Sequence, residues 1–232
     1  MDYNQAMPPG HIARNVAGLL AELPSNVTIV AAAKTRSPAE IVEAVEAGID
    51  IIGENHINEA RAAYEVVGKR AQWHFIGTPR SHGMRRKAIE ILDMIETIGS
   101  LAVAAEIDRR CGYLGKTMPV LIEVNSGREP QKSGVFPDEA AALVEQISSL
   151  THVRVMGLMT MGPVVADAHH ARPYFAETRS LFLAIRRLGL PNVDMKHLSM
   201  GMSDSYRVAV EEGATMVRIG TGIFGHRPKA LS

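Results

Sequence analysis

Apolar runs and amphipathic stretches alternate along the whole chain. Eight short runs of apolar, mostly small or β-branched residues predict buried strands, because parallel strands covered on both faces are almost continuously hydrophobic. The predicted strands span residues 27–33, 50–53, 72–76, 93–98, 118–125, 153–159, 193–198 and 215–219. Stretches with apolar residues at helical spacing predict helices over 38–48, 55–69, 84–90, 100–114, 137–149, 167–188 and 203–213. An extra helix is expected before the first strand, from Ile12 to Leu23, where Pro24 stops it.

Eight strand–helix units in 232 residues are typical of a closed parallel (β/α)8 TIM barrel. An open doubly wound sheet is the main alternative, and the order of elements alone does not exclude it. The glycine pattern Gly-x-Gly-x-x-Gly that often follows the first strand of such sheets is absent here. The chain contains no linker and no internal repeat, so we expect one domain over residues 1–232.

Charge and composition narrow the classes of function. Lys plus Arg and Asp plus Glu each number 25, so no basic excess points to nucleic acid. No segment approaches the roughly 20 apolar residues of a membrane span, and the N-terminus lacks the apolar core of a signal peptide. A single cysteine and no Cys/His cluster with metal-ligand spacing lead us to expect a cytoplasmic protein without a metal site.

Lys34 stands where the first predicted strand gives way to a helix, since Ser37 and Pro38 form a typical helix start. We expect this lysine to be partly buried. Burial lowers the pKa of an ammonium group, and a neutral amine can form a Schiff base with an aldehyde. An ordinary surface lysine at a strand end fits the position as well.

The loops after the last two strands are rich in glycine. In barrel enzymes these two loops often bind a phosphate, because glycine lets backbone N–H groups approach an anion closely. Ser203 is expected to cap the helix after the seventh strand, and Thr221 adds a hydroxyl beside Gly201, Gly220 and Gly222. Two tight turns that close the barrel are the alternative interpretation.

Arg218 lies inside the eighth predicted strand, on the face opposite its two apolar neighbours. An arginine keeps its charge, so a buried one needs a partner. The sequence leaves open an ion pair with Glu54 or Glu123, or a contact with a hydrogen-bond acceptor on a ligand.

Six motifs together resemble the pyridoxal phosphate homeostasis proteins, a family related to the N-terminal barrel of alanine racemase. The motifs are Ala33–Thr35, Gly53–Asn55, Trp73–Gly77, Gln131–Gly134, Leu198–Asp204 and Met216–Gly225. The resemblance covers nearly the whole chain. It departs from the usual family pattern at His56, at Asn58 and over residues 78–83, all close to the expected site.

The resemblance implies a cofactor, pyridoxal 5'-phosphate, and a role for each matching residue. Lys34 would form the internal aldimine, Ser203, Gly220 and Thr221 would hold the phosphate, Arg218 would face the pyridine nitrogen, and Asn55, His74 and Met200 would line the pocket. An arginine cannot donate a proton at neutral pH, so the pyridine nitrogen would stay unprotonated and the ring would be a weak electron sink.

The implied function is to bind, buffer or deliver pyridoxal phosphate, without efficient catalysis. The expected protein is a monomer or weak dimer, and pyridoxal-phosphate-dependent apoenzymes are the candidate recipients. An amino-acid racemase is the first alternative, but it needs a second acid/base. In alanine racemase a second domain of the partner subunit supplies that group, and this chain ends soon after the eighth strand. A cofactor-free Schiff-base aldolase acting on a sugar phosphate, with Lys34 as nucleophile, is the other alternative.

Overall fold

The computed structural model describes residues 10–79, 84, 86–163 and 165–226. Eight parallel strands close into a barrel in chain order. They are β1 Thr28–Ala32, β2 Ile51–Glu54, β3 Gln72–Phe75, β4 Met94–Ile98, β5 Met118–Val124, β6 Val153–Thr160, β7 Val193–Ser199 and β8 Met216–Ile219. Because β1 pairs with both β2 and β8, the sheet has no free edge there. The predicted barrel is confirmed, and the open sheet is wrong.

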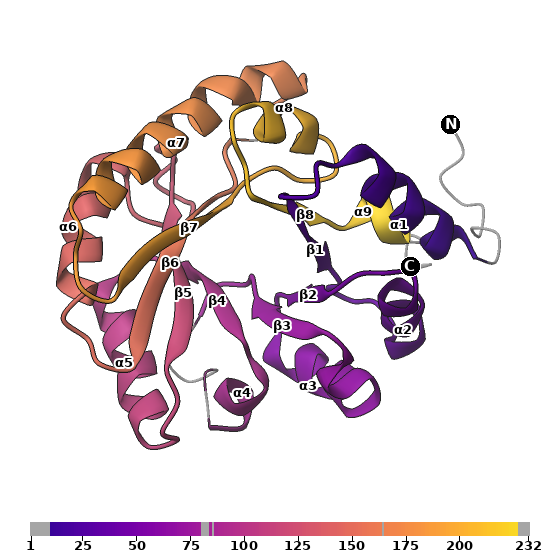
Figure 1. The fold of residues 1–232 in the computed structure, drawn as a ribbon, viewed down its shortest axis with the longest axis horizontal. Helices are drawn as coiled ribbons and strands as arrows, with labels where there is room; N and C mark the ends of the chain where they lie inside the picture. Colours follow the sequence, from indigo (N-terminus) through magenta and orange to yellow (C-terminus); the bar gives the residue numbers. More distant parts are fainter. Residues whose placement is uncertain (1–9, 80–83, 85, 164, 227–232) are drawn as a thin grey trace.

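The helices lie outside the strands, as Figure 1 shows. They are α1 His11–Glu22, α2 Pro38–Glu46, α3 Ile57–Val67, α4 Arg86–Ile91, α5 Leu101–Gly112, α6 Pro137–Ile147, α7 Arg172–Arg187, α8 Tyr206–Glu211 and α9 Thr221–Phe224, with 3-10 turns η1 Gly68–Arg70 and η2 Ala168–Ala171. The predicted helix 55–69 is divided into α3 and η1, and the short helix α9 was not predicted. The predicted helix 167–188 is divided into η2 and α7, and the predicted helix 203–213 begins only at Tyr206.

The start of α2 shows how local sequence places the first loop of the site. The Ser37 hydroxyl accepts the Glu40 backbone N–H, and the Glu40 carboxylate accepts the Ser37 N–H at 2.8 Å. Pro38 occupies the first helical turn, where its fixed backbone angle fits. This reciprocal capping box fixes where β1's loop ends and α2 begins.

Inward-facing residues change from apolar to polar along the strands. Val30, Ile51 and Met216 form one small interior cluster, and Met94, Leu121 and Met159 form another. Two residues further along β4, β5 and β8, the inward positions are Glu96, Glu123 and Arg218, because strand side chains alternate with a period of two. The carboxyl-terminal half of the barrel therefore encloses a polar layer. We call the end of the barrel above this layer the mouth.

The expected N-terminal helix is confirmed as α1, which packs beside α2 and α9. Its Asn15 side chain donates to the carbonyl oxygen of Ile223 at 2.9 Å. The extra helix thus holds the short helix that follows β8. None of the described helices combines the length and the apolar character that crossing a membrane requires.

Candidate functional site

Lys34 lies at the mouth, two residues beyond the last residue of β1, and its side chain is exposed. The expectation of partial burial is therefore wrong for this structure. The reason is that the chain turns at once, since Arg36 N–H donates to the carbonyl of Ala33 at 2.8 Å. The turn lifts the lysine above the polar layer, where its amine can meet a ligand.

Ser203 joins the two glycine loops. Its hydroxyl oxygen accepts the backbone N–H of Gly220 at 3.2 Å and that of Gly222 at 3.0 Å. Ser203 therefore does not cap the helix after β7 as expected. Ser205 holds that position before α8. The hydroxyl of Ser203 instead lies over two N–H groups at the start of α9, where the exposed residue Thr221 begins the helix.

Two glycines make this arrangement sterically possible. Gly201 has a φ of +92°, and an added Cβ would lie 2.6 Å from the Cβ of Ala209. At Gly220 an added Cβ would lie 3.3 Å from the carbonyl oxygen of Ala32, two residues before Lys34. The second contact shows that the loop after β8 lies directly against the end of β1. The two glycine loops and Lys34 therefore lie on the same side of the mouth.

Arg218 is 5 % exposed and faces the barrel interior. Its Nη1 donates to the Ser199 hydroxyl at 2.7 Å, and its Nη2 donates to the carbonyl of Thr160 at 2.8 Å. Within the described residues, the ion pairs do not include one from Arg218 to Glu54 or Glu123, the two partners considered from the sequence. A hydroxyl and a carbonyl oxygen thus accept the hydrogen bonds of the guanidinium. The carboxyl groups of Glu96 and Glu123 act on its charge from a longer distance.

The Ser199 hydroxyl links Arg218 to the carboxylate of Glu96 by hydrogen bonds. The Ser199 hydroxyl donates to Glu96 Oε2 at 2.7 Å, and Glu96 Oε1 lies 2.7 Å from His74 Nδ1. Burial alone would raise the pKa of Glu96, but the hydrogen bond and charge of His74, the charge of Arg218 and the Ser199 hydroxyl hold it below its usual value. A connected chain from β3 to β8 therefore fixes the orientation of Arg218.

Glu123 is the second carboxyl group of the polar layer and is 8 % exposed. Burial raises its pKa to about 7, and the charge of Arg218 opposes that rise. Glu123 also lines a cavity of about 310 Å³ at the mouth, together with Asn55, Asn125 and Lys132. This cavity is lined by residues in or just after β2, β3, β4, β5 and β6, and the glycine loops after β7 and β8 do not contribute to its lining.

The three residues expected to line the pocket lie at different depths. Asn55 is half-buried and lines the mouth cavity. His74 is 2 % exposed and belongs to the polar layer beneath the mouth. Met200 is 0 % exposed and packs in the apolar cluster between strands and helices. Because Ser199 faces inward, its neighbour Met200 faces outward, so its side chain is not placed in the mouth.

Positions that depart from the family pattern are only partly described. His56 precedes α3 and is exposed, without a side-chain hydrogen bond to the helix start, and Asn58 is exposed. Thr78 lines the mouth cavity, and its hydroxyl lies 3.3 Å from that of Ser133. Residues 80–83 of the variant segment 78–83 lie outside the described residues.

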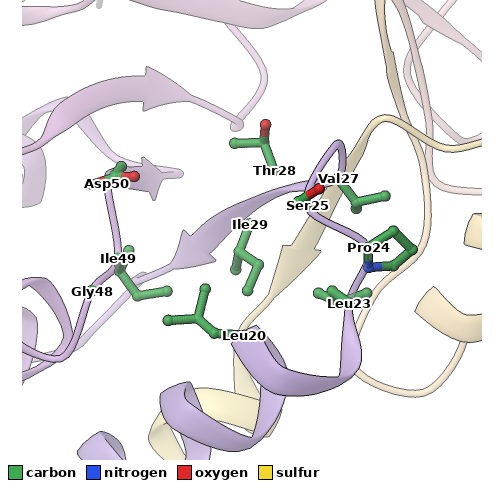
Figure 2. Close-up of a pocket in the computed structure, with 10 residues that line it drawn as sticks. All are labelled: Leu20, Leu23, Pro24, Ser25, Val27, Thr28, Ile29, Gly48, Ile49 and Asp50. Carbon is green, nitrogen blue, oxygen red and sulfur yellow. The ribbon is translucent and has the colours of Figure 1, made fainter.

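Sequence reasoning missed Glu96, Ser199 and Thr160 as supports of Arg218. A signal was present for Glu96, because it follows Met94 by two positions and so shares its inward face in a buried strand, where a carboxylate needs a partner. A cavity of about 220 Å³ was also not expected. Figure 2 shows it lined by Leu20, Thr28, Ile29 and Asp50, at the amino-terminal ends of β1 and β2 and thus opposite the mouth.

Comparison with known proteins gives consistent matches. The alanine racemase N-terminal domain family matches residues 9–228. The pyridoxal phosphate homeostasis protein of Aquifex aeolicus is 38% identical over 200 residues, which covers 86% of this chain and 86% of that protein. The protein of the same name from Pasteurella multocida is 34% identical over 206 residues, covering 88% of each chain.

Solved structures agree with these sequence matches. PipY of Synechococcus elongatus, determined with pyridoxal phosphate bound, superposes with a TM-score of 0.84 at 34% identity, covering 92% of this chain and all of that one. An alanine racemase of Clostridium difficile superposes with a TM-score of 0.76 at 15% identity, covering 96% of this chain and 58% of that one, which is a likeness of fold alone. The chain therefore belongs to the pyridoxal phosphate homeostasis proteins, a family whose barrel is that of the alanine racemase N-terminal domain.

Proposed function

We propose that this chain binds pyridoxal 5'-phosphate at the mouth of its barrel through Lys34, and that it holds, buffers or delivers the cofactor without efficient catalysis. The observation that carries the proposal is the grouping of an exposed amine, two glycine loops and a buried guanidinium at one side of the mouth. The family's name and the ligand in the PipY structure support the choice of cofactor.

The glycine loops suit a phosphate group. The N–H groups of Gly220 and Gly222 both point at one oxygen, the Ser203 hydroxyl, so they already converge on an oxygen atom. A phosphate oxygen would be a stronger acceptor, because hydrogen bonds to an ionised group are shorter and stronger than neutral ones. Ser203 could then turn to donate its own hydroxyl hydrogen, as could the exposed Thr221.

Arg218 suits the pyridine nitrogen. Its Nη1 and Nη2 atoms are held by Ser199 and Thr160, which fixes the plane of the guanidinium and leaves further N–H groups for a ligand. When bound, the cofactor supplies an aldehyde for an amine and a ring that accepts electrons most strongly when its nitrogen is protonated. Arg218 keeps its own protons, so it would favour binding over carbanion chemistry.

Amino-acid racemisation is the competing function, and it requires an acid/base on each face of the substrate. Among the described residues that line the mouth cavity, the ionisable side chains are Glu123 and Lys132. Lys132 pairs with Glu129 at 2.6 Å, which leaves Glu123, with a pKa of about 7, as the candidate for a second acid/base. A racemase assay on the wild type and on Glu123→Gln therefore discriminates between the two functions.

The direct test is to load the purified protein with pyridoxal phosphate and record its absorption before and after borohydride. We expect a yellow protein whose borohydride-fixed pyridoxyl group lies on the peptide containing Lys34. Lys34→Ala should lose the band and keep its unfolding temperature, whereas the matched control Lys196→Ala, at an exposed strand lysine, should keep the band. A colourless wild-type protein would favour the cofactor-free aldolase, and a label on Lys132 or Lys196 would overturn the assignment.

Delivery is tested by mixing the loaded protein with a pyridoxal-phosphate-dependent apoenzyme and a scavenger of free cofactor. Reactivation that outpaces the scavenger would support direct transfer. Reactivation only at the rate of free pyridoxal phosphate would leave binding and buffering as the function.

A further inference from the structure

The turn that carries Lys34 has an unusual backbone. Arg36 N–H closes it by donating to the carbonyl of Ala33 at 2.8 Å, so Lys34 and Thr35 are its central residues. Thr35 has a φ of +62°, while Lys34 does not have a positive φ. The third position of such a turn normally requires glycine or asparagine. A β-branched residue there is strained, and such strain persists only where surrounding contacts enforce it.

One contact enforces the strained turn directly. The backbone N–H of Thr35 donates to Oε2 of Glu59 at 2.8 Å. Glu59 lies in the first turn of α3, where a carboxylate is favoured by the helix dipole, so its position does not depend on the turn. A hydrogen bond to an ionised acceptor is stronger than a neutral one, which makes Glu59 suitable for this task.

The other side of the turn is tied to the glycine loop after β8. Arg36 Nη2 donates to the carbonyl oxygen of Gly225 at 2.5 Å, and its guanidinium lies 5.4 Å from the centre of the Phe224 ring. The turn is thus held between α3, through Glu59, and the end of α9, through Gly225. These two contacts fix where Lys34 lies relative to the glycine loop after β8.

We infer that Glu59 is a positioning residue for Lys34: by holding the Thr35 N–H, it keeps the strained turn closed and the amine at the mouth beside the glycine loops. The consequence for cofactor capture rests on the proposed function, whereas the effect on the turn does not. Glu59 acts through Thr35, without touching the ligand. Loss of Glu59 would let Thr35 leave the left-handed region, and Lys34 would move with it.

The first test uses the ligand-free protein and amide hydrogen exchange at Thr35 measured by NMR. Glu59→Ala should speed exchange of this amide by about tenfold or more, because its acceptor is gone. Glu59→Gln should keep most of the protection, since its side-chain oxygen still accepts a hydrogen bond. Glu65→Ala, at an exposed position of the same helix, is the matched control and should change nothing. Unchanged exchange in Glu59→Ala would overturn the inference.

The second test is a double-mutant cycle on capture of pyridoxal phosphate at Lys34, read by borohydride labelling. Glu59→Ala should weaken capture about tenfold when Thr35 is present, as expected from the cost of a strained residue. In the Thr35→Gly background the same change should cost at most about twofold, because glycine adopts this φ freely. Thr35→Asn should behave like Thr35→Gly and controls for the added flexibility of glycine.

Equal losses in all three backgrounds would show that Glu59 does not act through the turn, and would refute the inference. Failure of the proposed function would look different. In that case pyridoxal phosphate would label no lysine in any variant, or would label one other than Lys34, while the exchange result at Thr35 would still decide the role of Glu59.

Discussion

The stability of Glu54→Gln relative to wild type should rise as the pH rises. Glu54 ends β2, is 1 % exposed, and its Oε2 atom has no hydrogen-bond partner. Gly53 faces the interior, since an added Cβ would meet Val30 and Ile76, so Glu54 faces outward beneath the helices. Burial, followed by the charge of Glu59, raises the pKa of Glu54 to about 8.

The size and sign of the effect follow from proton linkage. A carboxyl with a raised pKa in the folded state stabilises fully below its unfolded pKa of 4.5, and this contribution is lost as the pH rises through about 8. Between these values one such group changes the free energy of unfolding by up to about 1.4 kcal/mol per pH unit. From pH 5.5 to 7.5, Glu54→Gln should therefore gain roughly 2–3 kcal/mol relative to wild type.

Urea unfolding of both proteins at pH 5.5, 6.5, 7.5 and 8.5 measures this difference. Glu123, whose pKa is about 7, is present in both proteins, so its own pH dependence cancels. Glu65→Gln, at an exposed carboxyl on α3, is the control and should track wild type at every pH. Parallel stability curves for wild type and Glu54→Gln would show that Glu54 is ionised in both states, and would refute the reasoning.

Three further predictions concern the site itself. The double variant Ser203→Ala, Thr221→Ala should lose about 1–3 kcal/mol of pyridoxal phosphate binding per hydroxyl but bind unphosphorylated pyridoxal as before, and equal losses in titrations with both ligands would contradict it. Gly201→Ala should destabilise the fold by about 1–3 kcal/mol in urea unfolding, because its φ is +92° and the Cβ of Ala209 would lie 2.6 Å away, and an unchanged midpoint would argue against that strain. With Arg218 in place, D- or L-alanine should racemise far below about 1 per second, and a chiral assay giving roughly 1–1,000 per second would restore the racemase hypothesis.

The barrel could be predicted because its signals are local. Each strand is a short apolar run, and Ser37 with Pro38 and Glu40 marks the start of α2 within four residues of chain. The closure of the sheet followed from counting strand–helix units against the chain length. Such features depend on neighbours in sequence, so they can be read before any contact is known.

The site was predicted less well, because its geometry depends on contacts distant in sequence. Lys34 was expected to be partly buried, but the turn held by Glu59, 24 residues away from Thr35, leaves it exposed. Ser203 was assigned to the helix that follows it, yet its hydroxyl meets N–H groups 17 and 19 residues further on. A residue's type indicates that it can cap or bind, while the fold decides which group it meets.

The charges of the polar layer illustrate why the partner of Arg218 could not be chosen from sequence. Glu54 was considered, but it faces outward, and Glu123 faces inward without pairing directly. In the polar layer, the carboxyl group with hydrogen-bond donors is the one whose pKa is lowered: Glu96 is hydrogen-bonded to His74 and Ser199. Burial instead raises the pKa of Glu123, which stays protonated up to about pH 7. The charge of Arg218 is thereby balanced by the carboxylate of Glu96, which Ser199 links to it. The second carboxyl, Glu123, has a pKa of about 7, so it can take up or release a proton near neutral pH when a ligand brings a new charge beside it.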